Sequence, residues 1–396
     1  MAPEAPKYID LFAGCGGLSL GLKKSGWRGL FAVEKDSFAF ETLKHNLIIQ
    51  NGHFDWPEWL PKKAHDIDSF LKVYKSEVRA LAGKVKMVAG GPPCQGFSVN
   101  GKRQQADKRN LLVDSYIDFI ELVQPQVILF ENVKGFTMEF IKNGTGTIFS
   151  DQVAERLRGL GYNIDADLVN FAEFGIPQRR LRFILFGTKK GSASDFFALL
   201  KSNKDQFLAK RGITAPQTVA QAISDLKRTH GATQCPDSES FESGIYGPKR
   251  TAYQKLMRAN SNQCCPDSHR FARHTQTIID RFSEILTRAP KNKQLSDCLR
   301  KEFNLKKRSI TPLSPDYTSP TITSLPDDYI HYSEPRILTV RECARIQSFP
   351  DNFLFKGKYT SGGNRRTKEV PRYTQVGNAV PPLFAELAGE IIKQLL

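Results

Sequence analysis

The sequence predicts an α/β fold with an open, mostly parallel sheet, joined to a smaller irregular region. Short strand-like apolar runs alternate with helical patterns over residues 7–188, as in sheets whose strands are connected by helices. From about Lys190 that alternation stops, and an irregular basic segment rich in Gly, Pro and Ser continues to Asp316. We therefore expect a domain change near residue 189.

The charge distribution favours a polyanionic partner. Of the 396 residues, 40% are hydrophobic and 25% are charged, which are ordinary values for a globular protein. Lys and Arg outnumber Asp and Glu by 57 to 41, and by 23 to 12 between Lys189 and Asp316 alone. A third of the chain thus carries most of the net charge of +16. This concentration favours a nucleic-acid-binding face over a uniformly basic surface.

Neither a membrane segment nor a disulfide framework is predicted. No run approaches the roughly 18 apolar residues that span a bilayer, and no secretory signal pattern is found at the N-terminus. Seven cysteines at irregular spacings favour a reducing cytoplasm. The group Cys264, Cys265, His269 and His274 has zinc-binding residue types, but its spacing matches no standard finger, so we expect no metal.

The first strand and the glycine turn after it suit the start of a nucleotide-binding sheet. Lys7–Ala13 is β-prone, and Gly14-Cys-Gly-Gly17 leads into a helical pattern. Glycines allow a ligand to approach the helix N-terminus closely. The next strand, Gly29–Glu34, ends in a carboxylate that can accept hydrogen bonds from both hydroxyls of a ribose. His65-Asp66-Ile67 is predicted as a third acidic strand end. For Gly14–Gly17 and Glu34 the alternative interpretation is a plain turn and a solvated Glu at the end of a strand.

The segment Gly90-Gly-Pro-Pro-Cys94 is the strongest candidate for a reactive site. It follows the apolar run Lys86–Ala89, so Cys94 is expected at the carboxyl edge of the sheet, where open α/β sheets bind ligands. The prolines stiffen this loop, and the small residues leave space beside the sulfur. We interpret Cys94 as a nucleophile rather than a packed thiol. Asn100–Asn110 is basic and lacks an apolar period, which predicts a movable loop beside Cys94, with an ordinary surface loop as the alternative.

An acid and two arginines are predicted near the same edge. The strand Pro125–Phe130 leads to Glu131, which is therefore expected at the same edge as Cys94. A nucleophile next to an acid is a typical arrangement of catalytic groups. Arg180 and Arg182 alternate along a later strand, so both are expected on one face. Buried guanidinium groups require anionic or carbonyl partners, which favours a site over a salt-bridged edge.

Regular secondary structure is again predicted near the C-terminus. Thr339 is a plausible N-cap with Glu342 three residues later, and Gln347 to Pro350 is expected to end that helix. Tyr373–Pro382 is predicted to be a tight turn that opens a last helix, Leu383–Leu395.

These motifs resemble, in content and order, those of the prokaryotic DNA (cytosine-5)-methyltransferases of restriction-modification systems. The resemblance covers roughly residues 7–188 and 318–396. The matching motifs are Asp10–Gly17, Glu34, Asp66-Ile67, Gly90–Ser98, Glu131–Val133, Gln178-x-Arg180-x-Arg182, Arg336–Pro350 and Gln375–Pro382.

The resemblance implies a Rossmann-like catalytic domain from residues 1–188 plus 370–396, and a target recognition domain from residues 189–369. It also implies S-adenosylmethionine as the cofactor, with Glu34 at its ribose and Asp66-Ile67 at its adenine. The residues it assigns to cofactor binding are Asp10, Phe12, Gly14, Gly16, Gly17, Glu34, Asp66, Ile67, Pro93 and Asn378.

The implied reaction is methylation at C5 of a cytosine flipped out of double-stranded DNA. Cys94 would attack C6, Glu131 would hydrogen-bond N3 and the exocyclic amine, and Arg180 and Arg182 would support the O2 side. The implied setting is a cytoplasmic, nucleoid-associated monomer that protects DNA from a paired restriction endonuclease. Two alternatives are a tRNA cytosine-5 methyltransferase of the same fold and a DNA-binding regulator without catalysis.

Overall fold

The chain folds into two units, each with its own apolar core. The first consists of Met1–Asn170, Leu181–Lys204 and Phe384–Leu396, and the second of Phe171–Arg180 and Asp205–Leu383. The computed structural model describes residues 4–93, 111–142, 145–261, 264–307, 309–362, 365 and 368–396. Cys94 and the predicted loop Asn100–Asn110 lie outside these residues.

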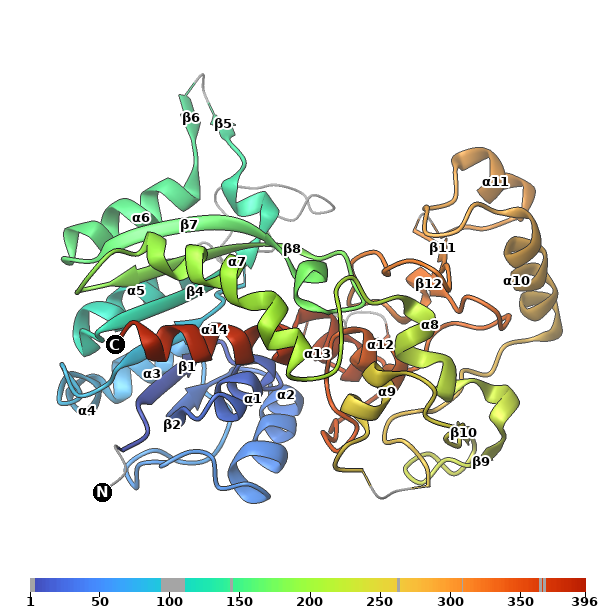
Figure 1. Ribbon diagram of the computed structural model, residues 1–396, viewed down its shortest axis with the longest axis horizontal. Coiled ribbons are helices and arrows are strands. Elements are labelled where there is room, and N and C mark those ends of the chain that lie inside the picture. Colours follow the sequence, from blue (N-terminus) through green and yellow to red (C-terminus); the bar gives the residue numbers. More distant parts are fainter. Residues whose placement is uncertain are drawn as a thin grey trace. The chain divides into compact units, whose positions relative to one another are not determined.

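A six-stranded sheet in the order β2-β1-β3-β4-β8-β7 forms the centre of the first unit (Figure 1). Neighbouring strands pair in parallel from β2 to β4, whereas β8 is antiparallel to both β4 and β7. The strands are β1 (Lys7–Leu11), β2 (Arg28–Val33), β3 (Met87–Gly90), β4 (Val127–Val133), β7 (Asn163–Asn170) and β8 (Leu181–Thr188). The predicted α/β class with a parallel-dominated sheet is confirmed, and its topology is Rossmann-like.

Helices pack on both faces of this sheet. The aromatic and aliphatic core on one face lies under α3 (Ile67–Val73), α4 (Lys75–Arg79), α5 (Leu111–Val123) and α6 (Phe149–Gly159). On β8, Phe183 and Leu185 belong to that core, so Phe186 points to the other face, where it stacks on Phe196 at a ring-centroid distance of 4.7 Å. The other face carries α1 (Gly17–Lys24), α7 (Ser194–Ala209) and α14 (Pro382–Gln394) (Figure 1).

Two side-chain-to-backbone hydrogen bonds join the last helix, α14, to the segment that follows the first helix, α1. Trp27 Nε1 donates to the carbonyl of Gly389 at 2.9 Å, and Lys393 Nζ donates to the carbonyl of Ser25, also at 2.9 Å. Between β2 and α3 the chain forms α2 (Ser37–Leu43), which continues as a π-helix, Lys44–Ile49. A separate hairpin pairs β5 (Phe140–Lys142) with β6 (Thr145–Thr147).

The second unit has little sheet among its described residues. Two short strand pairs occur: β9 (Ala232–Gln234) with β10 (Glu242–Gly244), and β11 (Thr311–Pro312) with β12 (Tyr329–Ile330). Its helices are α8 (Val219–Ile223), α9 (Ala252–Met257), α10 (Gln276–Arg288), α11 (Asp297–Glu302), α12 (Val340–Ile346) and α13 (Arg372–Asn378). Because these elements are short, much of the order must come from side chains that join them.

Buried arginines on α12 are side chains that join these short elements. Arg345 is fully buried and forms a two-pronged contact with Asp351, in which Nη2 lies 2.6 Å from Oδ2. Its guanidinium also donates to Asp225 at 3.2 Å and to the carbonyl of Ala222 at 2.9 Å. The charge of Asp351 holds the pKa of Arg345 above its usual value despite the burial that opposes it.

Most predicted elements match the structure, but several local expectations were wrong. Tyr373–Pro382, predicted to be a tight turn, instead begins within the helix α13 (Arg372–Asn378). The Thr339–Glu342 capping box, the end of α12 at Gln347 and the last helix are confirmed. Asp66, however, is the N-cap of α3, because its carboxylate accepts the Ser69 N–H and Ile67 starts an amphipathic helix instead of ending a strand. Arg180 lies one residue before the start of β8, so only Arg182 of the two is in the strand.

None of the described helices is both long and apolar enough to cross a membrane.

We predict that replacing Arg345 with Leu lowers the free energy of unfolding by about 3–5 kcal/mol, because Asp351 would stay buried without its main cationic partner and Asp225, of its described ion pairs, would keep only the one with Arg258. The matched control is Arg288→Leu, which breaks the half-exposed pair with Glu302 and is expected to cost less than about 1 kcal/mol. Urea unfolding followed by far-ultraviolet circular dichroism measures both. Equal losses in the two variants would contradict the structural role of Arg345.

Candidate functional site

The turn after β1 is the most strained backbone at the predicted site. Phe12 has φ 57°, a left-handed conformation that is uncommon for an aromatic residue and is found preferentially at functional sites. Gly14 and Gly16 are also left-handed, but they differ in surroundings. A Cβ at Gly14 would have no neighbour within 4 Å, whereas a Cβ at Gly16 would lie 2.9 Å from Leu47. Gly14 therefore leaves open space for a ligand, and Gly16 serves close packing.

Asp10 lies beneath this turn and is buried. Its Oδ2 accepts a hydrogen bond of 2.5 Å from Ser19 Oγ in the first turn of α1, which also contains Gly17. Burial raises the pKa of Asp10 to about 7, the nearby charge of Glu34 adds to this effect, and the Ser19 bond opposes it. Asp10 is thus a buried acid whose protonation can change near neutral pH.

Glu34 follows β2 and faces the glycine turn. Its Oε2 accepts the Gly14 N–H at 2.9 Å, and its Oε1 accepts the Asp36 N–H at 2.7 Å. Burial raises the pKa of Glu34, while these N–H bonds act to lower it. Each carboxylate oxygen retains a second lone pair, so Glu34 can still accept hydrogen bonds from two ligand hydroxyls.

Asp66 lies close to Glu34 through the backbone, because the His65 N–H donates to the Glu34 carbonyl at 2.7 Å. Lys35 Nζ contacts Asp66 Oδ2 at 2.8 Å, and although burial acts to raise the pKa of Asp66, this bond holds it below its ordinary value. Ile67 packs in the apolar core, with only 3% of its surface exposed. The structure thus brings Gly14, Glu34 and Asp66 together at one sheet edge.

Glu131 and Arg182 form an ion pair on the paired strands β4 and β8. Arg182 Nε lies 2.9 Å from Glu131 Oε1, and each side chain is at most 15% exposed. Burial lowers the pKa of Arg182, and the charge of Glu131 opposes this. The prediction that Glu131 follows its strand was slightly wrong, because β4 continues through Val133.

The Gly-Gly-Pro-Pro loop is packed against Glu131. A Cβ at Gly91 would lie 2.8 Å from Glu131 Oε2, so only glycine fits there without a shift. The neighbouring Asn132 is buried and donates through Nδ2 to the Pro92 carbonyl at 3.2 Å. Pro93, the last described residue before Cys94, is exposed. Asn132 had no role predicted from the sequence, although it lies inside the Glu131–Val133 motif.

Arg180 and Asn378 lie in the second unit. The guanidinium of Arg180 is buried and donates to the carbonyls of Ile322 at 3.2 Å and Gly377 at 2.8 Å. Asn378 is the last residue of α13, and its side chain is exposed. Arg182 and Glu131 are therefore brought together, whereas the described contacts of Arg180 are with backbone carbonyls.

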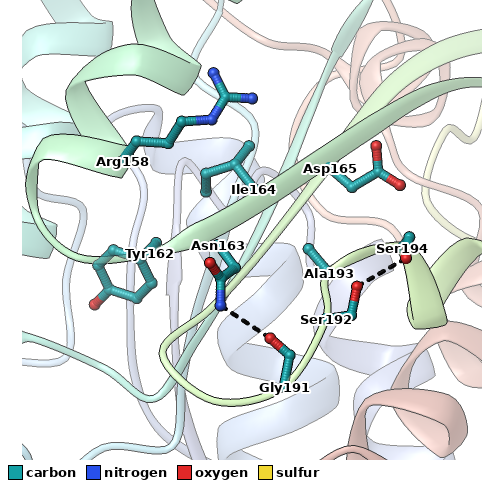
Figure 2. Close-up of a pocket in the computed structure, with 9 residues that line it drawn as sticks. All are labelled: Arg158, Tyr162, Asn163, Ile164, Asp165, Gly191, Ser192, Ala193 and Ser194. Carbon is teal, nitrogen blue, oxygen red and sulfur yellow. Dashed lines mark hydrogen bonds between the residues drawn. The ribbon is translucent and has the colours of Figure 1, made fainter.

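An open groove of about 550 Å³ lies elsewhere on the first unit (Figure 2). It is lined by the start of β7, the C-terminus of α6 and residues 191–194, with Asn163 donating to the Gly191 carbonyl at 2.9 Å. Because Thr188 pairs with Val127 and Arg182 with Val133, this groove lies at the opposite end of β8 from Arg182. None of the predicted site residues lines it, so we do not assign it to the reaction.

Among the described residues, no group of three or more His, Cys, Asp or Glu side chains is arranged to hold a metal ion. His269 is buried and bonds the Thr339 hydroxyl and the Leu226 carbonyl, both at 2.8 Å. Its two ring nitrogens are thus used in packing the second unit.

Comparisons with known proteins agree along the whole chain. The family model for C-5 cytosine-specific DNA methylases matches residues 6–394. The type II methyltransferase M.DdeI of Desulfomicrobium norvegicum is 32% identical over 405 residues, covering 97% of this chain and 88% of its own. The type II methyltransferase M.XorII of Xanthomonas oryzae pv. oryzae is 31% identical, covering 98% and 85%.

Solved structures show the same fold. A protein described as a DNA modification methyltransferase from an E. coli prophage is 24% identical, with a TM-score of 0.66 and 99% of both chains covered. The Entamoeba histolytica methyltransferase EhMeth is 14% identical, with a TM-score of 0.56 and 100% of both chains covered.

We predict that the stability of Asp10→Asn relative to wild type increases between pH 4 and pH 7. In that window the unfolded chain ionises Asp10 while the folded chain keeps it protonated, so wild-type stability falls as pH rises through the raised pKa of about 7. The full difference is at most about 4 kcal/mol. Urea unfolding followed by tryptophan fluorescence measures it, since Trp27, Trp56 and Trp59 all lie in the first unit. A pH-independent difference would contradict the raised pKa.

Proposed function

The chain belongs to the C-5 cytosine-specific DNA methylase family, and from this premise we propose that it methylates C5 of a cytosine flipped out of a specific duplex DNA sequence. The reaction would proceed through a covalent bond between Cys94 and C6 of the base. The observation that carries the proposal is the Glu131–Arg182 pair packed against the loop that leads directly to Cys94. An acid, a cation and a nucleophile are the groups this chemistry requires.

The residues at the β1–β2 edge fit S-adenosylmethionine. Open space above Gly14 admits a ligand to the turn, and the free lone pairs of Glu34 suit the two hydroxyls of a ribose. Asp66 would lie toward the adenine, and its Lys35 partner is 79% exposed on its side chain and so is free to move. Phe12, Asp10, Gly16 and Gly17 would shape and support the turn. The remaining contacts proposed for the cofactor are those of Ile67, Pro93 and Asn378.

Bound S-adenosylmethionine supplies an electrophilic methyl group. Cytosine C5 is a poor nucleophile, and addition of the Cys94 thiolate to C6 converts the ring into an enamine that can accept this group. Loss of the C5 proton and departure of the Cys94 thiolate then restore the aromatic ring. Because C6 is not accessible inside a stacked duplex, the cytosine must leave the helix first.

Glu131 would hold the base by hydrogen bonds to N3 and the exocyclic amine. Its ion pair with Arg182 fixes the carboxylate orientation and leaves Arg182 beside it to support the O2 side of the ring. We propose a positioning role for Arg180, since its guanidinium donates to the Ile322 and Gly377 carbonyls.

The DNA would be read by the second unit. Its basic sequence supports binding to phosphates, and its irregular loops are the usual carriers of base contacts. The type II names of the relatives support a role in protecting cellular DNA from a paired restriction endonuclease. A monomer acting on cytoplasmic DNA is the proposed state.

The test supplies radiolabelled S-adenosylmethionine with duplex DNA and, separately, with tRNA, and then maps 5-methylcytosine by bisulfite sequencing. We expect label in DNA only, confined to one short sequence. Label only in tRNA would favour a tRNA methyltransferase, and DNA binding without label would favour a regulator.

We predict that Cys94→Ser abolishes methyl transfer, because a serine hydroxyl is much less acidic and a weaker nucleophile than a thiol. The affinity for S-adenosylmethionine, measured by isothermal titration calorimetry, should remain within about twofold of wild type, an energy change of less than about 0.5 kcal/mol. Unchanged turnover would overturn the nucleophile assignment. A large loss of cofactor affinity would instead point to a misfolded variant.

A further inference from the structure

The amide of Gln347 joins three distant segments of the second unit. The residue is fully buried at the C-terminus of α12. Its Nε2 donates to the carbonyls of Val376 at 2.8 Å and Ala379 at 3.4 Å, and its Oε1 accepts from Gln178 Nε2 at 2.8 Å. Both amide hydrogens and the carbonyl oxygen are thus engaged, so Gln347 can hold only one orientation.

Arg180 binds the same segment, the C-terminal turn of α13. Its Nη2 donates to the Gly377 carbonyl, and its Nη1 donates to the Ile322 carbonyl. Gln178 Oε1 accepts the Ile322 N–H at 2.7 Å, so the Ile322 peptide is held at both its N–H and its carbonyl. A Cβ at Gly377 would collide with the Thr323 carbonyl, which shows how closely the two backbones pack.

The carbonyls that accept these hydrogen bonds belong to residues on both sides of Asn378. Val376, Gly377 and Ala379 each have a buried side chain donating to them, whereas the Asn378 side chain is exposed. Such an arrangement fixes the backbone of the turn and leaves one side chain available for a ligand. Buried donors cost free energy unless satisfied, so the network strongly disfavours alternative turn conformations.

We infer that Gln347 and Arg180 are positioning residues that set the affinity for S-adenosylmethionine by fixing the turn that presents Asn378. This inference rests on the proposed assignment of Asn378 to cofactor binding. It explains why Arg180, though close in sequence to Arg182, contacts backbone carbonyls.

The experiment measures the Kd of S-adenosylhomocysteine by isothermal titration calorimetry on the full chain, so no turnover intervenes. Gln347→Met keeps the side-chain volume and removes all three hydrogen bonds. The matched control is Gln254→Met, since Gln254 is also fully buried and its side chain makes three hydrogen bonds, with Ser224 at 2.8 Å, the Arg250 N–H at 2.8 Å and the Thr251 N–H at 3.3 Å, none of which involves α13. We expect Kd to rise roughly tenfold for Gln347→Met and less than about twofold for the control, with similar losses of Tm.

A double-mutant cycle with Asn378→Ala tests whether Gln347 acts through Asn378. We expect Asn378→Ala to weaken binding and to abolish any further effect of Gln347→Met. A full effect of Gln347→Met in the Asn378→Ala background, or equal effects of Gln347→Met and its control, would overturn the inference. Unchanged affinity in Asn378→Ala alone would refute the cofactor assignment itself. If Gln347→Met does not fold, Arg180→Lys replaces it, because lysine cannot reach two carbonyls with a fixed fork.

Discussion

The register between β4 and β8 determines the chemistry available at the sheet edge. Glu131 is directly opposite Ile184, so the two side chains share a face, and Arg182 lies two residues further along on that same face. The 2.9 Å contact between Arg182 and Glu131 is the diagonal pair that this register creates. A slip of one residue would turn Arg182 to the opposite face and leave Glu131 buried without its cation. The apolar partners of β8, including Phe183 and Leu185, specify the register and therefore the site.

The two units are held in a defined structure by different interactions. In the first, parallel strands and apolar helix faces supply a continuous core. In the second, short elements are joined by buried guanidinium groups, such as Arg345 with Asp351 and Arg336 with Glu342. Removing one partner of such a pair is costly, so these joints hold irregular segments in one arrangement.

Much of the fold was predictable because local signals agree with the global arrangement. Apolar runs marked β1 to β4, the Thr339–Glu342 capping box marked α12, and the final apolar period marked α14. The failures have local causes. Asp66 has the same residue type whether it ends a strand or caps a helix, and only the Ser69 hydrogen bond distinguishes the two. Alternation placed Arg180 on the face of Arg182, but the strand starts one residue too late for this to hold.

The site was predictable in its residue types but not in the division of roles. The glycines of the first turn look equivalent in sequence. Gly14 nevertheless faces open space, whereas the space beside Gly16 is occupied by Leu47, a residue 31 positions away. Long-range packing of this kind has no local signature.

The same reasoning separates the two arginines of one motif. Arg182 serves the first unit through Glu131, and Arg180 serves the second through the Gly377 carbonyl. The chain passes from one unit to the other between them, so a motif only five residues long, Gln178 to Arg182, contributes to both units. Neither arginine can substitute for the other, because one requires a carboxylate as its partner and the other requires two backbone carbonyls. The spacing of the motif is therefore constrained by two cores at once.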